Sequence, residues 1–137
     1  MLLKRLMCAA LAGTSLFLVG GPIAQAHRAA ASTQAVLGQI ERGQWLLKER
    51  LGGERKICFT APVNFIQIGH GNAPCEQFVI AQDQHAATVR YTCTGHGNGR
   101  TTVTVETPRL VRIETQGVLD GSPFEQEYEA RRVGACS

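Results

Sequence analysis

Strict alternation of apolar and polar residues is the main pattern in the second half of the chain. In residues 87–94, Val89, Tyr91 and Cys93 share one face, and polar residues occupy the other. Residues 124–130 alternate in the same way, with Phe124 on the apolar face and glutamates on the opposite face. A period of two is typical of a strand with one buried and one solvated face. Both stretches are therefore predicted as β-strands.

Shorter apolar or β-branched runs predict the remaining strands, since these residue types pack well on a pleated surface. We expect them at residues 45–51, 55–59, 76–81, 100–107 and 109–116. Trp45, Leu47 and Leu51 would share one face of the first of these strands. Gly52-Gly53 predicts a hairpin turn, and Pro108, which cannot donate to a ladder, predicts another turn. A longer turn is expected over residues 117–123.

A short helix is predicted at about residues 61–68. Thr60 can cap it, Pro62 lies in its first turn, and Gly69 ends it. One or two helical turns are also expected within residues 33–40. Short strands with frequent turns and little helix predict a mainly β domain, an antiparallel meander sheet curved into a half-barrel or sandwich.

The first 26 residues have the layout of a cleavable signal peptide. Lys4 and Arg5 precede an apolar run that ends near Gly20, and Ala24-Gln25-Ala26 supplies the small-x-small site. A membrane-spanning helix needs about 20 apolar residues, so we expect no stable membrane insertion after cleavage. The prediction is a periplasmic protein with a flexible arm at residues 27–39 and a single domain at residues 40–137.

Removal of the signal peptide also changes the charge. The full chain has a formal net charge of +3, and losing Lys4 and Arg5 reduces it to +1. A nucleic-acid-binding domain normally carries a clear basic excess. We therefore expect no nucleic-acid partner.

The expected mature chain contains four cysteines: Cys58, Cys75, Cys93 and Cys136. An even number in an exported chain predicts two disulfides. Their spacing lacks both the Cys-x-x-Cys pattern of redox sites and the two close pairs of zinc sites. Three pairings are possible. We favour Cys58–Cys75, which would fix the short helix, and Cys93–Cys136, which would tie the C-terminal tail to the central strand.

Candidate catalytic groups are few. Glu125, Glu127 and Glu129 share one face of a predicted strand and could supply a carboxylate pair for glycoside hydrolysis. A solvated outer face balanced by arginines such as Arg112 explains the same row, and we favour it because catalytic carboxylates usually face each other across a cleft. No serine lies in a nucleophile elbow.

The histidines offer no recognisable metal site. His70, His85 and His96 fall in three different predicted loops, and their spacing matches no common zinc motif. No phosphate loop or dinucleotide fingerprint occurs either. We therefore expect neither a metal nor a cofactor.

The glycine-rich stretch Gly95-His-Gly-Asn-Gly99 allows two interpretations. Its backbone N–H groups could form an anion-binding nest beside Arg100. A hairpin tip that needs positive φ angles explains the glycines without a ligand, and we favour it. If a binding site exists, its candidate rim is Tyr91, His96 and Arg100.

Several motifs together resemble a known family. They are Gly43-Gln-Trp45, Cys58 followed by a proline-containing helix, Cys75 before a Phe-Val-Ile strand, and Arg132-Val-Gly-Ala-Cys136. The family comprises small exported bacterial proteins and is catalogued as a domain of unknown function (number thirty-six seventeen). The likeness covers about residues 40–136.

Further motifs resemble the branch of that family found in sphingomonad-type proteobacteria. They are Tyr91-Thr-Cys, Gly99-Arg-Thr-Thr, Glu106-Thr-Pro-Arg-Leu-Val, Gln116-Gly and Asp120-Gly-x-Pro-Phe124. The resemblance implies an envelope location, paired cysteines and one β-rich domain. It supplies no catalytic residues to transfer.

Export, disulfides and the absence of catalytic motifs predict a non-catalytic domain that binds an envelope protein or a small ligand. Trp45, Phe78, Tyr91 and Tyr128 could line a concavity for that purpose. The alternative is a small periplasmic hydrolase that uses Glu125 and Glu127 or the loop histidines.

Overall fold

The computed structural model describes residues 35–137, which form a single seven-stranded antiparallel sheet and a short helix. The elements are β1 (Gly43–Glu49), β2 (Glu54–Phe59), α2 (Val63–Ile66), β3 (Cys75–Gln82), β4 (Ala86–Cys93), β5 (Gly97–Thr107), β6 (Leu110–Leu119) and β7 (Ser122–Gly134). One further helical turn occupies residues 35–37. The prediction of a mainly β, antiparallel fold with two disulfides is confirmed.

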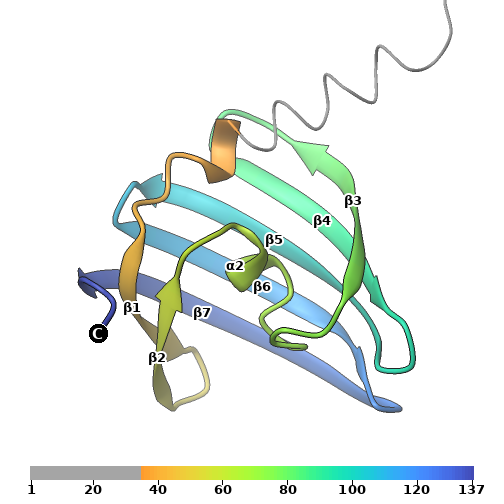
Figure 1. Cartoon of the computed structure of the whole chain (residues 1–137). Coiled ribbons are helices and arrows are strands. Elements are labelled where there is room, and N and C mark those ends of the chain that lie inside the picture. The colour runs from red at the N-terminus through yellow and green to blue at the C-terminus, as the bar shows by residue number, and fades with distance from the viewer. Residues whose placement is uncertain (1–34) are drawn as a thin grey trace, which may run out of the picture.

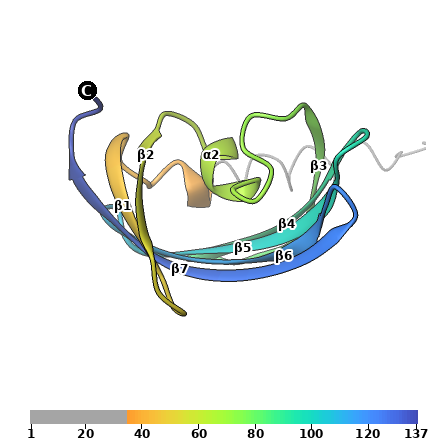
Figure 2. The same cartoon turned by 90° about the horizontal axis from the view of Figure 1, so that it is seen from below.

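The strand order is β2-β1-β7-β6-β5-β4-β3. Strands β3 to β7 form a meander, whereas the β1–β2 hairpin joins the sheet beside β7, the last strand of the chain. The sheet is open and strongly curved, and α2 lies inside the curve (Figures 1 and 2). The shape is therefore that of a half-barrel whose hollow is filled by the chain's own segments.

The hydrophobic core lies between the concave face of the sheet and α2. Trp45, Phe59 and Phe65 pack ring against ring, with centroids 4.5 to 6.1 Å apart. The predicted alternation in β4 is confirmed, because Val89, Tyr91 and Cys93 are buried there while the residues between them are exposed.

The core also includes Val36, Leu37 and Ile40, which precede β1. The packed domain therefore extends into residues 35–39, which we had assigned to the flexible arm. The predicted signal peptide at residues 1–26 lies outside the described residues. Within residues 35–137, no helix is long and apolar enough to cross a membrane.

Two turns differ from the prediction: one is shorter and the other is longer. Strand β6 continues to Leu119, so the expected turn at residues 117–123 contracts to Asp120 and Gly121, with φ angles of 48° and 84°. Strand β1 ends at Glu49, and Leu51 lies in the following turn with 88% of its surface exposed. The prediction that Leu51 shares the buried face of Trp45 and Leu47 is therefore wrong.

The helix is also shorter than predicted, and Thr60 does not cap it. Its N-cap is Pro62, which makes no side-chain capping bond. Instead, the Asn64 side-chain oxygen accepts hydrogen bonds from the N–H groups of Thr60 and Ala61 at 2.9 and 3.0 Å. Asn64, in the first turn of the helix, therefore holds the two residues that precede Pro62 in place.

The predicted disulfide pairing is wrong, although all four cysteines are paired. The bonds are Cys58–Cys136 and Cys75–Cys93. Cys75 and Cys93 are register partners on β3 and β4, with Cα atoms 4.1 Å apart. Because β7 pairs with β1, the tail after it emerges near β2 and far from β4. The topology of the last strand thus decides the pairing.

Candidate functional site

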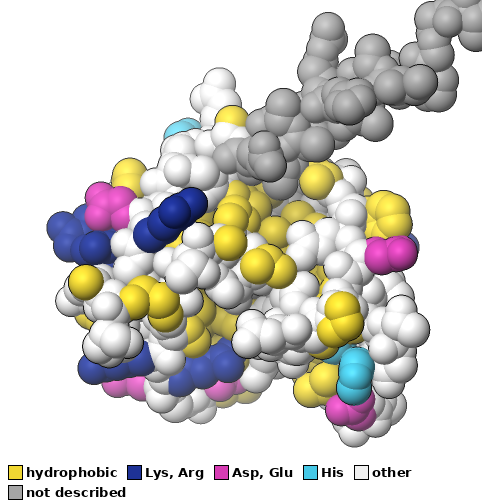
Figure 3. Space-filling view, viewed as in Figure 1, with side chains coloured by type: hydrophobic (Ala, Val, Ile, Leu, Met, Phe, Trp, Pro, Cys, Tyr) yellow, Lys and Arg dark blue, Asp and Glu magenta, His cyan; other side chains and the backbone are white. Residues whose placement is uncertain are grey.

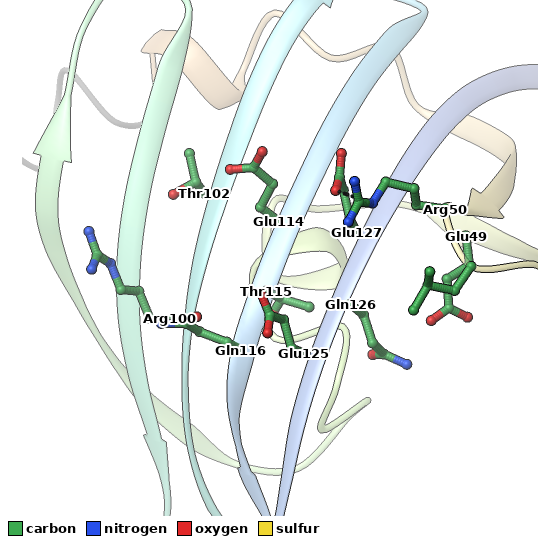
Figure 4. Close-up of a pocket in the computed structure, with 11 residues that line it drawn as sticks. Glu49, Arg50, Arg100, Thr102, Glu114, Thr115, Gln116, Glu125, Gln126 and Glu127 are labelled. Carbon is green, nitrogen blue, oxygen red and sulfur yellow. Dashed lines mark ion pairs between the residues drawn. The ribbon is translucent and has the colours of Figure 1, made fainter.

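The convex face of the sheet carries an open polar depression of about 470 Å³. We call it the convex depression. It is lined chiefly by Arg50, Arg100, Glu114, Gln116, Glu125 and Glu127 (Figure 4). Because successive strand residues point to opposite faces, every second residue of β5, β6 and β7 contributes to this surface.

The sheet register aligns these side chains in two neighbouring rows. Arg100, Gln116 and Glu125 are consecutive cross-strand partners on β5, β6 and β7. Thr102, Glu114 and Glu127 form the next row, so two glutamates lie directly opposite each other. Like charges in this position destabilise a sheet. The opposed glutamates, Glu114 and Glu127, therefore destabilise this part of the sheet.

Part of the charge on the convex face is neutralised internally. Arg50 pairs with Glu127 at 2.9 Å (Figure 4). Arg131 pairs with Glu129, and Arg112 with Glu106, both at 2.8 Å. The expected balancing of the glutamate row by arginines is thus present, although Arg112 bonds Glu106 rather than Glu129, its cross-strand partner.

Among the charged residues that β4 to β7 place on this face, four have no ion-pair partner within the described part of the chain: Arg90, Arg100, Glu114 and Glu125. Arg90 and Arg100 are cross-strand partners on β4 and β5, so a second like-charge pair occurs here. The Arg100 guanidinium points away from Glu125 (Figure 4). Unpaired positive charge therefore lies over β4 and β5, and unpaired negative charge over β6 and β7.

The glutamate row does not have the arrangement of a glycosidase site. Glu125 and Glu127 lie on one face of one strand, and Glu127 is engaged by Arg50. Glycoside hydrolysis needs two carboxyl groups that flank the scissile bond. Residues 35–137 also contain no group of three or more His, Cys, Asp or Glu side chains placed to hold a metal ion. The surface is suited to binding polar and charged groups.

Tyr91, one of the predicted rim residues, is fully buried on the concave face. Its hydroxyl lies 3.1 Å from His70 Nδ1 and bonds the hydroxyls of Thr115 and Thr101. Burial raises the pKa of Tyr91, and those two hydroxyls partly oppose the shift. His70 Nε2 lies 3.2 and 3.1 Å from the carbonyl oxygens of His96 and Val118.

These contacts define the hydrogen positions. Since a carbonyl oxygen can only accept, the proton of His70 belongs on Nε2, and Nδ1 accepts from the Tyr91 hydroxyl. Every member of this buried network has a partner. Tyr91 and His70 are therefore parts of the core. The sequence analysis placed Tyr91 on a candidate binding rim and His70 in a loop. It did not predict that the loop after α2 folds inward and buries both side chains.

The other two rim residues lie on different surfaces. His96 is in the exposed β4–β5 turn, where its Nδ1 is 3.1 Å from an Asp120 carboxylate oxygen. Arg100 lies on the convex face, opposite to the face that buries Tyr91. The structure therefore does not bring the three residues together. His85 lies in the β3–β4 turn, at the other end of β4 from His96.

The predicted aromatic concavity is also absent. Trp45, Tyr91 and Tyr128 are at most 3% exposed, and Trp45 packs against Phe65 of α2. Figure 3 views this filled side of the molecule. Phe78 is 59% exposed and lies on edge strand β3. The prediction fails because the short helix and its loops occupy the hollow.

Sequence reasoning missed Glu114, Arg90 and Arg50 as members of the charged surface. The alternation in β4 and β6 assigns Arg90 and Glu114 to outer faces, which was an available signal. The cross-strand register that aligns them depends on turn lengths, and those were predicted incorrectly. In comparisons with known proteins, no family model and no curated protein matches the chain.

Proposed function

We propose that the protein is an exported, non-catalytic binding domain that holds a polar ligand with separated charges on its convex face. The proposal rests on the segregation of unpaired charge: Arg100 lies on one side of the depression, next to its cross-strand partner Arg90, and Glu114 and Glu125 lie on the other side. A ligand with an anionic group at the arginines and a cationic or hydroxyl group at the glutamates would match it.

The like-charge pairs support this function. A sheet face selected only for stability would place opposite charges in register, whereas Arg90 faces Arg100 and Glu114 faces Glu127. A bound ligand would relieve both repulsions. The ligand class we propose is a component of the cell envelope, a protein segment or a small molecule, that carries both charges.

The proposed location is the periplasm. Two disulfides, Cys58–Cys136 and Cys75–Cys93, are typical of an oxidising compartment. The signal-like first 26 residues and the resemblance to an exported family support the same compartment.

The test is site-specific photo-cross-linking in intact cells. A photoreactive residue replaces Gln116, at the centre of the depression, and Lys56 on the distant strand β2 serves as the control position. We expect a specific adduct from position 116 only, and a loss of at least tenfold when Arg100→Gln or Glu125→Gln is added. Lys56→Gln is the matched charge control and should leave the adduct unchanged. Equal adducts from both positions, or an adduct insensitive to both charge changes, would refute the proposal.

A further inference from the structure

A second open depression lies beside the convex depression. Its volume is about 890 Å³, and its lining residues come from β4 to β7. The polar side chains that line it over β4 and β5 are Arg90, Thr92, Asn98 and Arg100. We call these four residues the arginine cluster. Arg100 also lines the convex depression, so the two depressions adjoin.

The sheet register places the two arginines of the cluster next to each other. Arg90 and Arg100 are cross-strand partners on β4 and β5, and the Cβ atoms of such partners lie about 5 Å apart. Their partners on the outer sides of the same row are Phe78 and Gln116. Neither of these residues is charged, so no carboxylate lies directly opposite either arginine in this row.

The carboxylates of the neighbouring rows do not neutralise the pair. Glu76 and Glu114 are the diagonal neighbours of Arg90 and Arg100, and diagonal neighbours lie about 7–8 Å apart. Neither glutamate forms an ion pair within residues 35–137. The Arg100 guanidinium also points away from Glu125 (Figure 4). Two guanidinium charges therefore lie together without an ion-pair partner in the described part of the chain.

Two neighbouring guanidinium groups suit an anion that carries two charges and several oxygens. Each guanidinium is permanently charged and offers a planar fork of N–H donors that matches phosphate. A phosphate monoester carries about −1.5 to −2 charges at pH 7 and three acceptor oxygens, whereas a carboxylate has two oxygens. Thr92 and Asn98 are exposed cross-strand partners in the adjacent row, and their hydroxyl and amide groups add neutral donors.

We propose that the anionic group of the ligand is a phosphate monoester held between the Arg90 and Arg100 guanidinium groups. This inference rests on the proposed function and names the chemistry of its anion. Both arginines would donate hydrogen bonds to the phosphate oxygens, and Thr92 and Asn98 would donate to the same group from the adjacent row. The bound dianion would also remove the repulsion between the two arginines.

The experiment titrates the purified protein with inorganic phosphate, and with acetate at equal ionic strength, and follows the backbone amide NMR shifts of β4 and β5. We expect saturable shifts, with phosphate bound about fivefold more tightly than acetate or better, because its charge is larger. Arg90→Gln and Arg100→Gln should each weaken phosphate binding about tenfold or more, the usual effect of losing a hydrogen bond to a charged group.

Arg112→Gln is the matched control. It removes one positive charge from the same face, where Arg112 is paired with Glu106, and it should leave phosphate affinity unchanged. Thermal melting should not decrease in the Arg90 and Arg100 variants, because each removes a like-charge contact. Equal affinities for phosphate and acetate, a lack of saturation by phosphate, or an equal loss in Arg112→Gln would each overturn the phosphate assignment.

The cross-link at position 116 separates this inference from the proposed function. A specific adduct without phosphate binding would support the proposed function and refute the phosphate monoester. Phosphate binding without a specific adduct would support the anion site and refute the larger ligand. Co-sedimentation with phosphatidylcholine vesicles, with and without phosphatidic acid, then identifies the source. Sedimentation that needs phosphatidic acid and Arg90 indicates a lipid phosphate, and its absence indicates a soluble phosphate ester.

Discussion

The Tyr91 hydroxyl donates a hydrogen bond to His70 Nδ1 across 3.1 Å, and this contact fixes the loop after α2 to the centre of the sheet. The two rings also pack edge to face, 5.2 Å apart. Since His70 Nε2 reaches carbonyl oxygens of the β4–β5 turn and of β6, one imidazole connects three segments that are distant in sequence.

Replacing Tyr91 with phenylalanine should therefore cost more than the loss of one hydroxyl. The buried Nδ1 of His70 would have no donor, and unsatisfied buried polar groups cost about 1–3 kcal/mol. We expect a decrease of that size in the free energy of unfolding, measured by urea denaturation. Tyr128→Phe is the control, because the partner of its hydroxyl is the exposed Arg55, which can turn to water. Equal losses in the two variants would contradict the network.

Gly99 should tolerate no side chain. It is the cross-strand partner of Tyr91, and a Cβ atom at Gly99 would collide with the Tyr91 hydroxyl. We expect Gly99→Ala to destabilise the fold by about 1–3 kcal/mol, the usual cost of overpacking. Gly134→Ala, in strand β7 with open space around the Cβ position, should have little effect. Thermal unfolding of both variants measures the difference, and equal melting temperatures would disprove the steric argument.

The chain has two tyrosines, Tyr91 and Tyr128. Both should lose their phenolic proton at a higher pH than a solvated tyrosine does. Burial raises the pKa of both, and at Tyr128 the Arg55 charge opposes the shift. The folded protein then keeps phenolic protons that the unfolded chain, with a pKa of about 10, releases. Stability is thus unaffected below about pH 10 and decreases as the pH rises from there through the folded-state pKa values.

Phenolate absorbance during a pH titration measures this directly. The tyrosines of the folded protein should ionise at a higher pH than those of the protein in urea, which titrate at about pH 10. Ionisation of either tyrosine at its ordinary pKa in the folded protein would show that its hydroxyl is solvated.

The two disulfides should stabilise the fold unequally. Loop-closure entropy predicts about 4.5 kcal/mol for the longer loop and about 3 kcal/mol for the shorter one, since the sequence separations are 78 and 18 residues. Replacing Cys58 and Cys136 with alanine should therefore reduce the free energy of unfolding more than replacing Cys75 and Cys93. However, Cys93 is buried, so its replacement also removes packing.

Peptide mapping of the unreduced protein checks the pairing itself. The peptide containing Cys58 should be joined to the C-terminal peptide. A linked pair of Cys58 and Cys75 would restore the pairing first predicted from the sequence and contradict the strand order described above.

The sequence was sufficient to predict the strands, because alternation in β4 and β7 reflects burial on one face. It was insufficient for the disulfides, because pairing depends on which strands are neighbours. The position of β7 beside β1 is a long-range property. No local pattern around Cys136 indicates it.

The candidate site was predictable only in part. The outward direction of Glu125 and Glu127 follows from alternation. Their relation to Glu114 and Arg100 follows from register, which two short turns at residues 94–96 and 120–121 determine. The burial of His70 depends on the curvature of the whole sheet. Periodic patterns in the sequence do not indicate that curvature.

Strand β7 has a consequence for how the protein is made. It is the last strand to be synthesised, yet it lies between β6 and the hairpin formed by the earliest strands, and a disulfide fastens the residues that follow it. A chain that is synthesised from its N-terminus can assemble the β3–β6 meander early. Strand β1 cannot join that meander until β7 is available to pair with it. Completion of the sheet therefore waits for β7, and the β1–β2 hairpin stays separate from the meander until then.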